Sequence, residues 1–189
     1  MTSFRNFFIL SSLILATLGL MQLAACGPGN SETGTQVPKR SIHEAAFMGD
    51  LDLMQAHIEA GSDLNQKDDF GSTPLIIAIT FDQSAVAKQL IEAGADLNAT
   101  GADGGTALHS AAFYCRTDLV QALLDKGAEL NIRNQYGSTA LASVEGPFEQ
   151  VKMVYDQVSK DLGPLGFKLD YAHLQATRPQ VADMIRQAQ

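Results

Sequence analysis

The sequence predicts an all-α fold, a solenoid of about five helix-turn-helix units joined by projecting loops. The main observation is an internal repeat, since residues 40–145 return to the same residue types every 33 positions, at Gly61, Gly94 and Gly127 and again at Asn65, Asn98 and Asn131. The second observation is that each unit carries signals for two short helices and one loop. A fixed period of this length predicts stacked units that bury their apolar faces against their neighbours.

Composition narrows the functional classes. The chain has 189 residues, of which 46% are hydrophobic, so a folded core is expected. Its 21 acidic and 13 basic residues give a net charge of -8, which argues against nucleic acid as a partner. Two cysteines, Cys26 and Cys115, are too few for a disulfide framework or a four-thiolate metal site.

Residues 1–25 are predicted to be an export signal. Arg5 is followed by an almost uninterrupted apolar stretch over 7–23, and the small residues Ala24 and Ala25 precede Cys26. This ending resembles the lipobox of bacterial lipoproteins, which implies cleavage before Cys26 and acyl chains on that cysteine. An uncleaved signal-anchor helix is the alternative, because about 17 apolar residues are just enough to span a bilayer.

Residues 26–39 are expected to form a lipid-anchored flexible tether with a reach of roughly 20 Å, because they are rich in Gly, Pro, Ser and Thr. By the lipoprotein resemblance, Gly27 after the cysteine favours the outer membrane, with the folded part facing the periplasm. Cleavage before Cys26 would remove Arg5 with the signal segment, so the remaining chain would have 12 basic residues and 21 acidic ones. We do not expect so acidic a body to lie flat on anionic lipid, so the lipid is the expected membrane contact.

Residues 73–105 show how one repeat is built. Thr73 followed by Pro74 predicts a helix start, and this first helix is expected to run to about Phe81. A second helix is predicted over 85–93, ending at Gly94 in a left-handed conformation. The residues up to Gly105 then form the projecting loop.

The repeated motifs resemble the ankyrin repeat. Gly71-Ser72-Thr73-Pro74-Leu75 and the stretch from Gly104 to Ala112 are similar to its Gly-x-Thr-Pro-Leu-His-x-Ala-Ala signature, and Gly94-Ala95-Asp96-Leu97-Asn98 is similar to its Gly-Ala-Asp-Val-Asn ending. The resemblance implies an ankyrin repeat domain over 40–189, with units at about 40–69, 70–102, 103–135, 136–168 and 169–189.

The two ends of the array depart from the motif. The first unit lacks the Gly-x-Thr-Pro that should precede it, as expected of a terminal cap. The fourth has Glu145-Gly146-Pro147 at its inter-helix turn and loses the Gly-Ala-Asp-Val-Asn ending. We expect the fifth unit to be a C-terminal cap made of two helices, one over 170–177 and one over 179–187 with Pro179 in its first turn.

No constellation predicts catalysis, a cofactor or a metal. His43-Glu44 matches the start of a His-Glu-x-x-His zinc helix, but Phe47 stands where the second histidine would be. The ankyrin resemblance instead implies that His43 and His109 bond the backbone of neighbouring loops, and His173 is expected to do the same. His57 is expected to pack in a partly buried position. Cys115 is either a tolerated inter-helix turn residue or a lone thiol that reacts or pairs between molecules in an oxidising compartment.

Exposed aromatic residues are the expected partner site. Ankyrin proteins bind through loop tips and the exposed side of the first helices, and those positions here hold Phe47, Met48, Phe70, Phe81, Phe113, Tyr114 and Tyr136. Aromatic clusters of this kind favour protein contacts. The alternative is packing between adjacent units, above all for Phe47 and Phe113, which share a register.

The sequence therefore predicts a non-catalytic, monomeric lipoprotein anchored by Cys26, which binds an unidentified protein through a concave aromatic face. A second hypothesis is an accessory or protective factor for a periplasmic enzyme such as a catalase, because some exported bacterial ankyrin proteins resemble this chain and support peroxide-detoxifying catalases. A hydrolase or redox enzyme using Cys115 or a histidine is a third class, with no convergent site behind it.

Overall fold

The structure is a computed structural model that describes residues 36–189. The expected signal segment 1–25, the lipidation residue Cys26 and most of the expected tether lie outside these residues. The described part is helical, with loops and turns between its helices. None of the helices in this part is long and apolar enough to cross a membrane.

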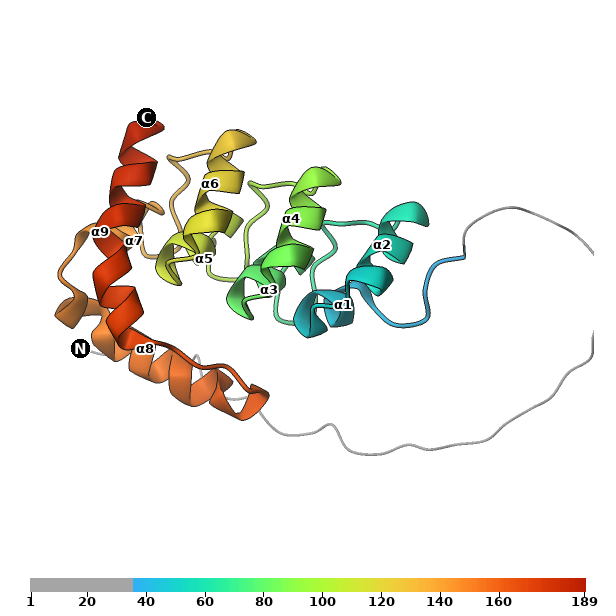
Figure 1. Cartoon of the computed structure of the whole chain (residues 1–189), viewed down its shortest axis with the longest axis horizontal. Coiled ribbons are helices and arrows are strands. Elements are labelled where there is room, and N and C mark those ends of the chain that lie inside the picture. The colour runs from blue at the N-terminus through green and yellow to red at the C-terminus, as the bar shows by residue number, and fades with distance from the viewer. Residues whose placement is uncertain (1–35) are drawn as a thin grey trace, which may run out of the picture. The chain divides into compact units, whose positions relative to one another are not determined.

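Three regular helix pairs come first. They are α1 (Ile42–Met48) with α2 (Leu51–Glu59), α3 (Pro74–Thr80) with α4 (Ser84–Glu92), and α5 (Ala107–Phe113) with α6 (Thr117–Asp125). In Figure 1 the first helices α1, α3 and α5 form one row and the second helices α2, α4 and α6 form another, and consecutive members of each row pack together. The predicted repeat is confirmed, and the ends of α3 and α4, the helices whose bounds were predicted, lie within about one residue of those expected.

Local chemistry fixes the ends of these helices. The Ser41 hydroxyl accepts a hydrogen bond from Glu44 N at 3.0 Å, and the Thr73 hydroxyl accepts one from Ile76 N at 3.3 Å. The turn between paired helices needs a left-handed residue, which is Gly49 in the first pair (φ +71°), Asp82 in the second (φ +61°) and Cys115 in the third (φ +55°).

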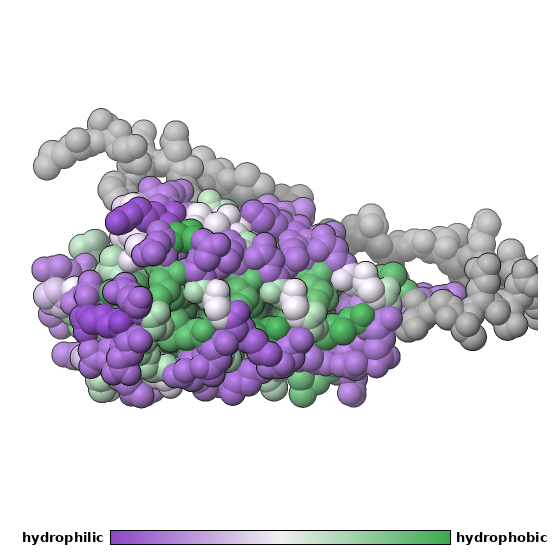
Figure 2. Space-filling model, turned by 90° about the horizontal axis from the view of Figure 1, so that it is seen from above, coloured by the Kyte–Doolittle hydropathy of each residue, from purple (hydrophilic) through white to green (hydrophobic). Residues whose placement is uncertain are grey.

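Small and branched apolar side chains build the interfaces between units. Ala45, Ala78 and Ala111 are fully buried and let the first helices approach closely, while Leu75 and Leu108 fill the space beside them. Viewed from above, the stack shows apolar residues recurring along its length between hydrophilic flanks, as expected when each unit presents the same positions (Figure 2).

The repeated asparagines link neighbouring units outside the core. Asn65 Oδ1 accepts a hydrogen bond from Asp96 N at 2.8 Å, and Asn98 Oδ1 accepts one from Glu129 N at 2.9 Å. Asn65 and Asn98 therefore each satisfy a loop amide of the next unit, which gives a physical reason for asparagine at this position of the repeat.

The C-terminal part differs from the expected fifth unit. Helix α7 (Ala142–Glu145) packs beside α5, and α9 (Tyr171–Gln187) packs against α6 and α7. The fourth pair is therefore α7 with α9, and 169–189 is its second helix rather than a separate unit. Between them lie α8 (Phe148–Leu162) and the 3₁₀ turn η1 (Gly163–Leu165), both within residues 146–170, which we call the crossing segment.

The expected helix pair in the cap is wrong, because α9 is continuous through Pro179. Leu174, Val181, Ala182 and Ile185 are buried apolar residues of α9. Proline inside a helix costs about 3 kcal/mol, and burial of an apolar face this long offsets that cost. The chain leaves the regular pattern earlier, at Gly146-Pro147, where proline disfavours helix in the preceding residue.

Candidate functional site

Two surfaces of the described residues carry exposed apolar side chains, and the first is formed by the loop tips. The Asp68 carboxylate accepts hydrogen bonds from Phe70 N (2.9 Å) and Ser72 N (2.8 Å), and Asn134 Oδ1 accepts the equivalent bonds from Tyr136 N (3.0 Å) and Ser138 N (3.1 Å). Both tips are thus ordered by their own side-chain hydrogen bonds.

These turns hold aromatic side chains in solvent. Phe70 is 75% exposed and Tyr136 is 69% exposed. The tip between them carries Asp103, whose carboxylate accepts a hydrogen bond from Gly105 N at 2.9 Å and whose carbonyl accepts one from Gln135 N at 2.8 Å. Two aromatic tips with a carboxylate-bearing tip between them therefore form a preorganised surface, which we call the tip surface.

Sequence reasoning missed Asp68 and Asn134 as the residues that order the tips. The signal was present, because each stands three residues before a glycine, Gly71 or Gly137, and the two positions are two repeat periods apart. Asp and Asn at the start of such a turn, followed by glycine, predict this hydrogen-bonded geometry.

The other predicted partner residues lie at the opposite ends of the first helices, and most of them contact the chain itself. Phe47 lies 4.6 Å from Phe81 and Phe113 stacks on Tyr155 at 4.4 Å, measured between ring centroids. Phe167 lies 6.1 Å from Phe81 and 5.5 Å from Tyr114.

This corrects the expectation of one open aromatic face. Tyr114 is only 9% exposed, and Phe47, Phe81 and Phe113 are half-buried. Of the seven predicted partner residues, only Met48, Phe70 and Tyr136 are largely exposed. Packing between units, the alternative for Phe47 and Phe113, holds for Phe47, whereas Phe113 is covered by α8.

A buried polar network fixes the crossing segment. The Tyr155 hydroxyl donates to Phe113 O at 2.7 Å, and Arg178 donates from Nη1 to Tyr155 Oη and from Nη2 to Gly146 O, both at 3.1 Å. Arg178 is 2% exposed, so these bonds are shielded from water. Burial raises the pKa of Tyr155 and of Tyr114 to about 12, so both hydroxyls stay protonated well above neutral pH.

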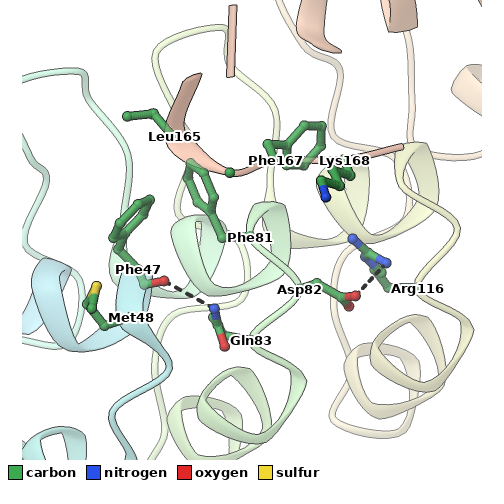
Figure 3. A pocket seen from close by; sticks show the side chains of 10 residues that line it. Phe47, Met48, Phe81, Asp82, Gln83, Arg116, Leu165, Phe167 and Lys168 are labelled. Atoms are coloured by element: carbon green, nitrogen blue, oxygen red, sulfur yellow. Dashed lines mark hydrogen bonds and ion pairs between the residues drawn. The ribbon is translucent and has the colours of Figure 1, made fainter. Parts of the chain in front are cut away.

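The second surface is a pocket where the crossing segment meets the ends of α1 and α3, and we call it the edge pocket. Its volume is about 380 Å³. Figure 3 shows Met48, Phe47 and Leu165 on one side and Lys168, Arg116 and Asp82 on the other. Arg116 Nη1 lies 3.0 Å from Asp82 Oδ2, and Gln83 donates to Phe47 O at 3.2 Å.

The histidines have structural roles, with two corrections. His43 Nε2 lies 2.8 Å from Gln66 O and His109 Nε2 lies 3.1 Å from Ser138 O, which confirms the expected bonds to loop backbone. His57 is buried and bonds both Ser62 Oγ and Arg40 O, so it is more than a packing residue. His173 faces Thr177 of its own helix at 3.4 Å instead of a neighbouring loop, because α9 is one continuous helix.

Cys115 occupies the inter-helix turn and is buried. Its thiol contacts Leu174 O at 3.7 Å, and burial raises its pKa to about 11. A reactive cysteine needs an exposed thiolate, and this thiol lacks both the exposure and the charge. The structure therefore favours the turn-residue interpretation.

Comparison with known proteins shows that the repeats match a known family. Residues 42–134 match the family model for ankyrin repeats in three copies. The chain is also similar to the crystal structure of the ankyrin repeat domain of Bcl-3, a member of the IkappaB protein family, with 30% identity and a TM-score of 0.52. That alignment covers 54% of this chain and 45% of the Bcl-3 chain. No curated protein sequence matches this chain.

Proposed function

Because this chain is an ankyrin repeat protein, we propose that it is a non-catalytic protein-binding module whose partner docks on the tip surface. The observation that carries this proposal is the exposure of Phe70 and Tyr136 on turns that Asp68 and Asn134 already order. Large aromatic side chains held in water on rigid turns lose little conformational freedom on binding, so their contact area contributes efficiently to affinity.

Asp103 adds polarity to this surface. It lies on the middle tip, and its carbonyl is tied to the next tip through Gln135 N. A partner that covers both aromatic side chains must also satisfy or avoid this carboxylate, so we expect it to present a hydrogen-bond donor between two apolar patches.

The experiment is photocrosslinking of the full chain on native membranes, with the double variant Phe70→Ala/Tyr136→Ala compared with Met153→Ala. Met153 is a matched control because it is an exposed apolar residue on α8 (80% exposed) and lies outside the tip surface. We expect the double variant to lose a crosslinked partner that Met153→Ala retains, with helical circular dichroism unchanged in both. Equal capture by the two variants would overturn the proposal.

We further propose that the module is tethered to a bacterial membrane, facing the periplasm, by acyl chains on Cys26. The support is the sequence pattern described above, a basic start, an apolar stretch and small residues before the cysteine. Replacement Cys26→Ser should move the protein from the membrane fraction to the soluble fraction. Continued membrane retention of the variant would favour an uncleaved helix over 7–23 instead.

A further inference from the structure

The edge pocket is a second candidate binding surface, distinct from the tip surface. Its walls combine repeat residues with Leu165, Phe167 and Lys168, which lie beyond the range 42–134 matched by the ankyrin family model. The pocket is therefore a feature of this chain's crossing segment rather than of the repeat alone. Its volume of about 380 Å³ suits one or two side chains of a bound peptide.

The apolar side of the pocket is open to solvent. Met48 is 60% exposed and Leu165 is also exposed, while Phe47, Phe81 and Phe167 form the more buried wall behind them. Methionine adapts its shape to an incoming side chain at little cost. An apolar side chain of a partner could thus enter between Met48 and Leu165.

The polar side of the pocket carries an excess of positive charge. Asp82 neutralises Arg116, but Lys168 forms no ion pair with any residue of the described range 36–189. In the same range, Arg116 Nε is buried without a hydrogen-bond acceptor. On a chain whose net charge is -8, this is a local cationic spot.

We propose that the edge pocket binds an acidic segment of a partner protein, with an apolar side chain between Met48 and Leu165 and an adjacent glutamate or aspartate carboxylate beside Lys168 and Arg116. Charge complementarity supports this occupant, because a carboxylate neutralises the spot. A membrane surface fits less well, since the acidic body is repelled by anionic headgroups.

The carboxylate belongs to a side chain rather than to a chain terminus. Terminal carboxylates are captured by groups of unpaired backbone amides. Three amides at the pocket are already used, because Gly166 N donates to Gly163 O at 2.9 Å, Phe167 N to Leu162 O at 3.3 Å and Gln83 N to Ala78 O at 2.8 Å. The side chains of Lys168 and Arg116 carry the positive charge at the pocket, so recognition of the anion is assigned to them.

The test is a titration of the full chain, labelled with ¹³C in its methionine methyl groups, with the peptide acetyl-Phe-Glu-amide. The Met48 methyl reports on the pocket, the buried Met54 reports on the fold and Met153 on α8 is an internal control. We expect the Met48 resonance to move and the other two to stay. The uncharged analogue acetyl-Phe-Gln-amide should bind about five-fold more weakly.

Two variants sharpen the charge argument. Lys168→Glu should weaken the binding of acetyl-Phe-Glu-amide by about five-fold or more. Asp82→Asn keeps a residue that tolerates the left-handed turn, and it should strengthen the binding of this peptide by a few-fold. Lys67→Glu makes the same charge change at an exposed position that does not line the pocket, and should have little effect.

The outcomes separate the possibilities. An unmoved Met48 resonance at saturating peptide, equal binding of the Glu and Gln peptides, or indifference to Lys168→Glu would each overturn the proposal. So would a Met48 shift with vesicles containing phosphatidylglycerol but not with peptide, which would indicate a membrane contact. The tip variants Phe70→Ala and Tyr136→Ala leave this pocket intact. A negative result for binding at the tip surface is therefore distinguishable from a negative result for binding at the edge pocket.

Discussion

Cys115 illustrates how one position meets two demands at the residue scale. It takes the left-handed turn conformation that Gly49 and Asp82 take in the other pairs, and it also faces the interior against Leu174. Cysteine behaves as a small apolar residue when buried, so it fills this interior space, where an aspartate like that of the second pair would be unfavourable. The price is a raised thiol pKa of about 11, which keeps the sulfur protonated.

The first prediction follows from that environment. In a Cys26→Ser background, Cys115 should react with Ellman's reagent at pH 8 about 100-fold more slowly in the folded protein than in guanidinium, because it is buried and mostly protonated. Measurement of the two labelling rates checks this. Rapid labelling of the folded protein would show that the turn opens readily.

The same thiol should affect stability at high pH. Its folded pKa of about 11 lies above the unfolded value of about 8.5, so its stabilising contribution is complete below pH 8.5 and is lost as pH rises through 11. The unfolding free energy should therefore fall more steeply over this range in wild type than in Cys115→Ser. Tyr114 titrates in both proteins and cancels in this comparison, whereas Cys115 itself helps to raise the pKa of Tyr155, so part of the difference comes from that tyrosine.

At the scale of elements, α9 shows burial outweighing local preference. Pro179 is exposed, yet the helix passes through it because the opposite face is buried. Replacement Pro179→Ala restores a backbone donor and removes a steric clash without loss of packing. We expect it to stabilise the protein by about 2 kcal/mol in urea unfolding, after allowance for the greater freedom of the unfolded chain. A destabilised variant would mean that the proline packs usefully.

Phe167 anchors the crossing segment between α3 and α5. It is buried and contacts both Phe81 and Tyr114, so Phe167→Ala should cost about 3 kcal/mol and expose those rings. Amide exchange over 163–169 should accelerate. Leu165→Ala, two residues away and exposed, is the matched control and should change stability by no more than about 0.5 kcal/mol. Equal effects of the two changes would argue against this anchoring role.

At the scale of the whole molecule, the features that could be predicted from the sequence are those set by short motifs within each repeat. Thr73, Gly94 and the 33-residue spacing predict helix starts, ends and stacking order, because caps and turns act over a few residues. The burial of Tyr114 was not predictable in this way. It depends on the crossing segment, which has helical periodicity but no repeat register to indicate the face it covers. For the same reason Leu165 and Lys168 were missed as pocket residues.

Stacking also makes the repeats energetically dependent on one another. Leu108 in α5 is fully buried, and α5 packs against α3, α6 and α7. Replacement Leu108→Ala should cost about 3–5 kcal/mol and accelerate amide exchange in α3 and α9 as well as in α5, because each unit is stabilised through its neighbours. Leu51→Ala, at an exposed position of α2, is the control and should leave exchange in these helices unchanged. Acceleration confined to α5 and α6 would show that the units unfold separately, which would contradict a single cooperative stack.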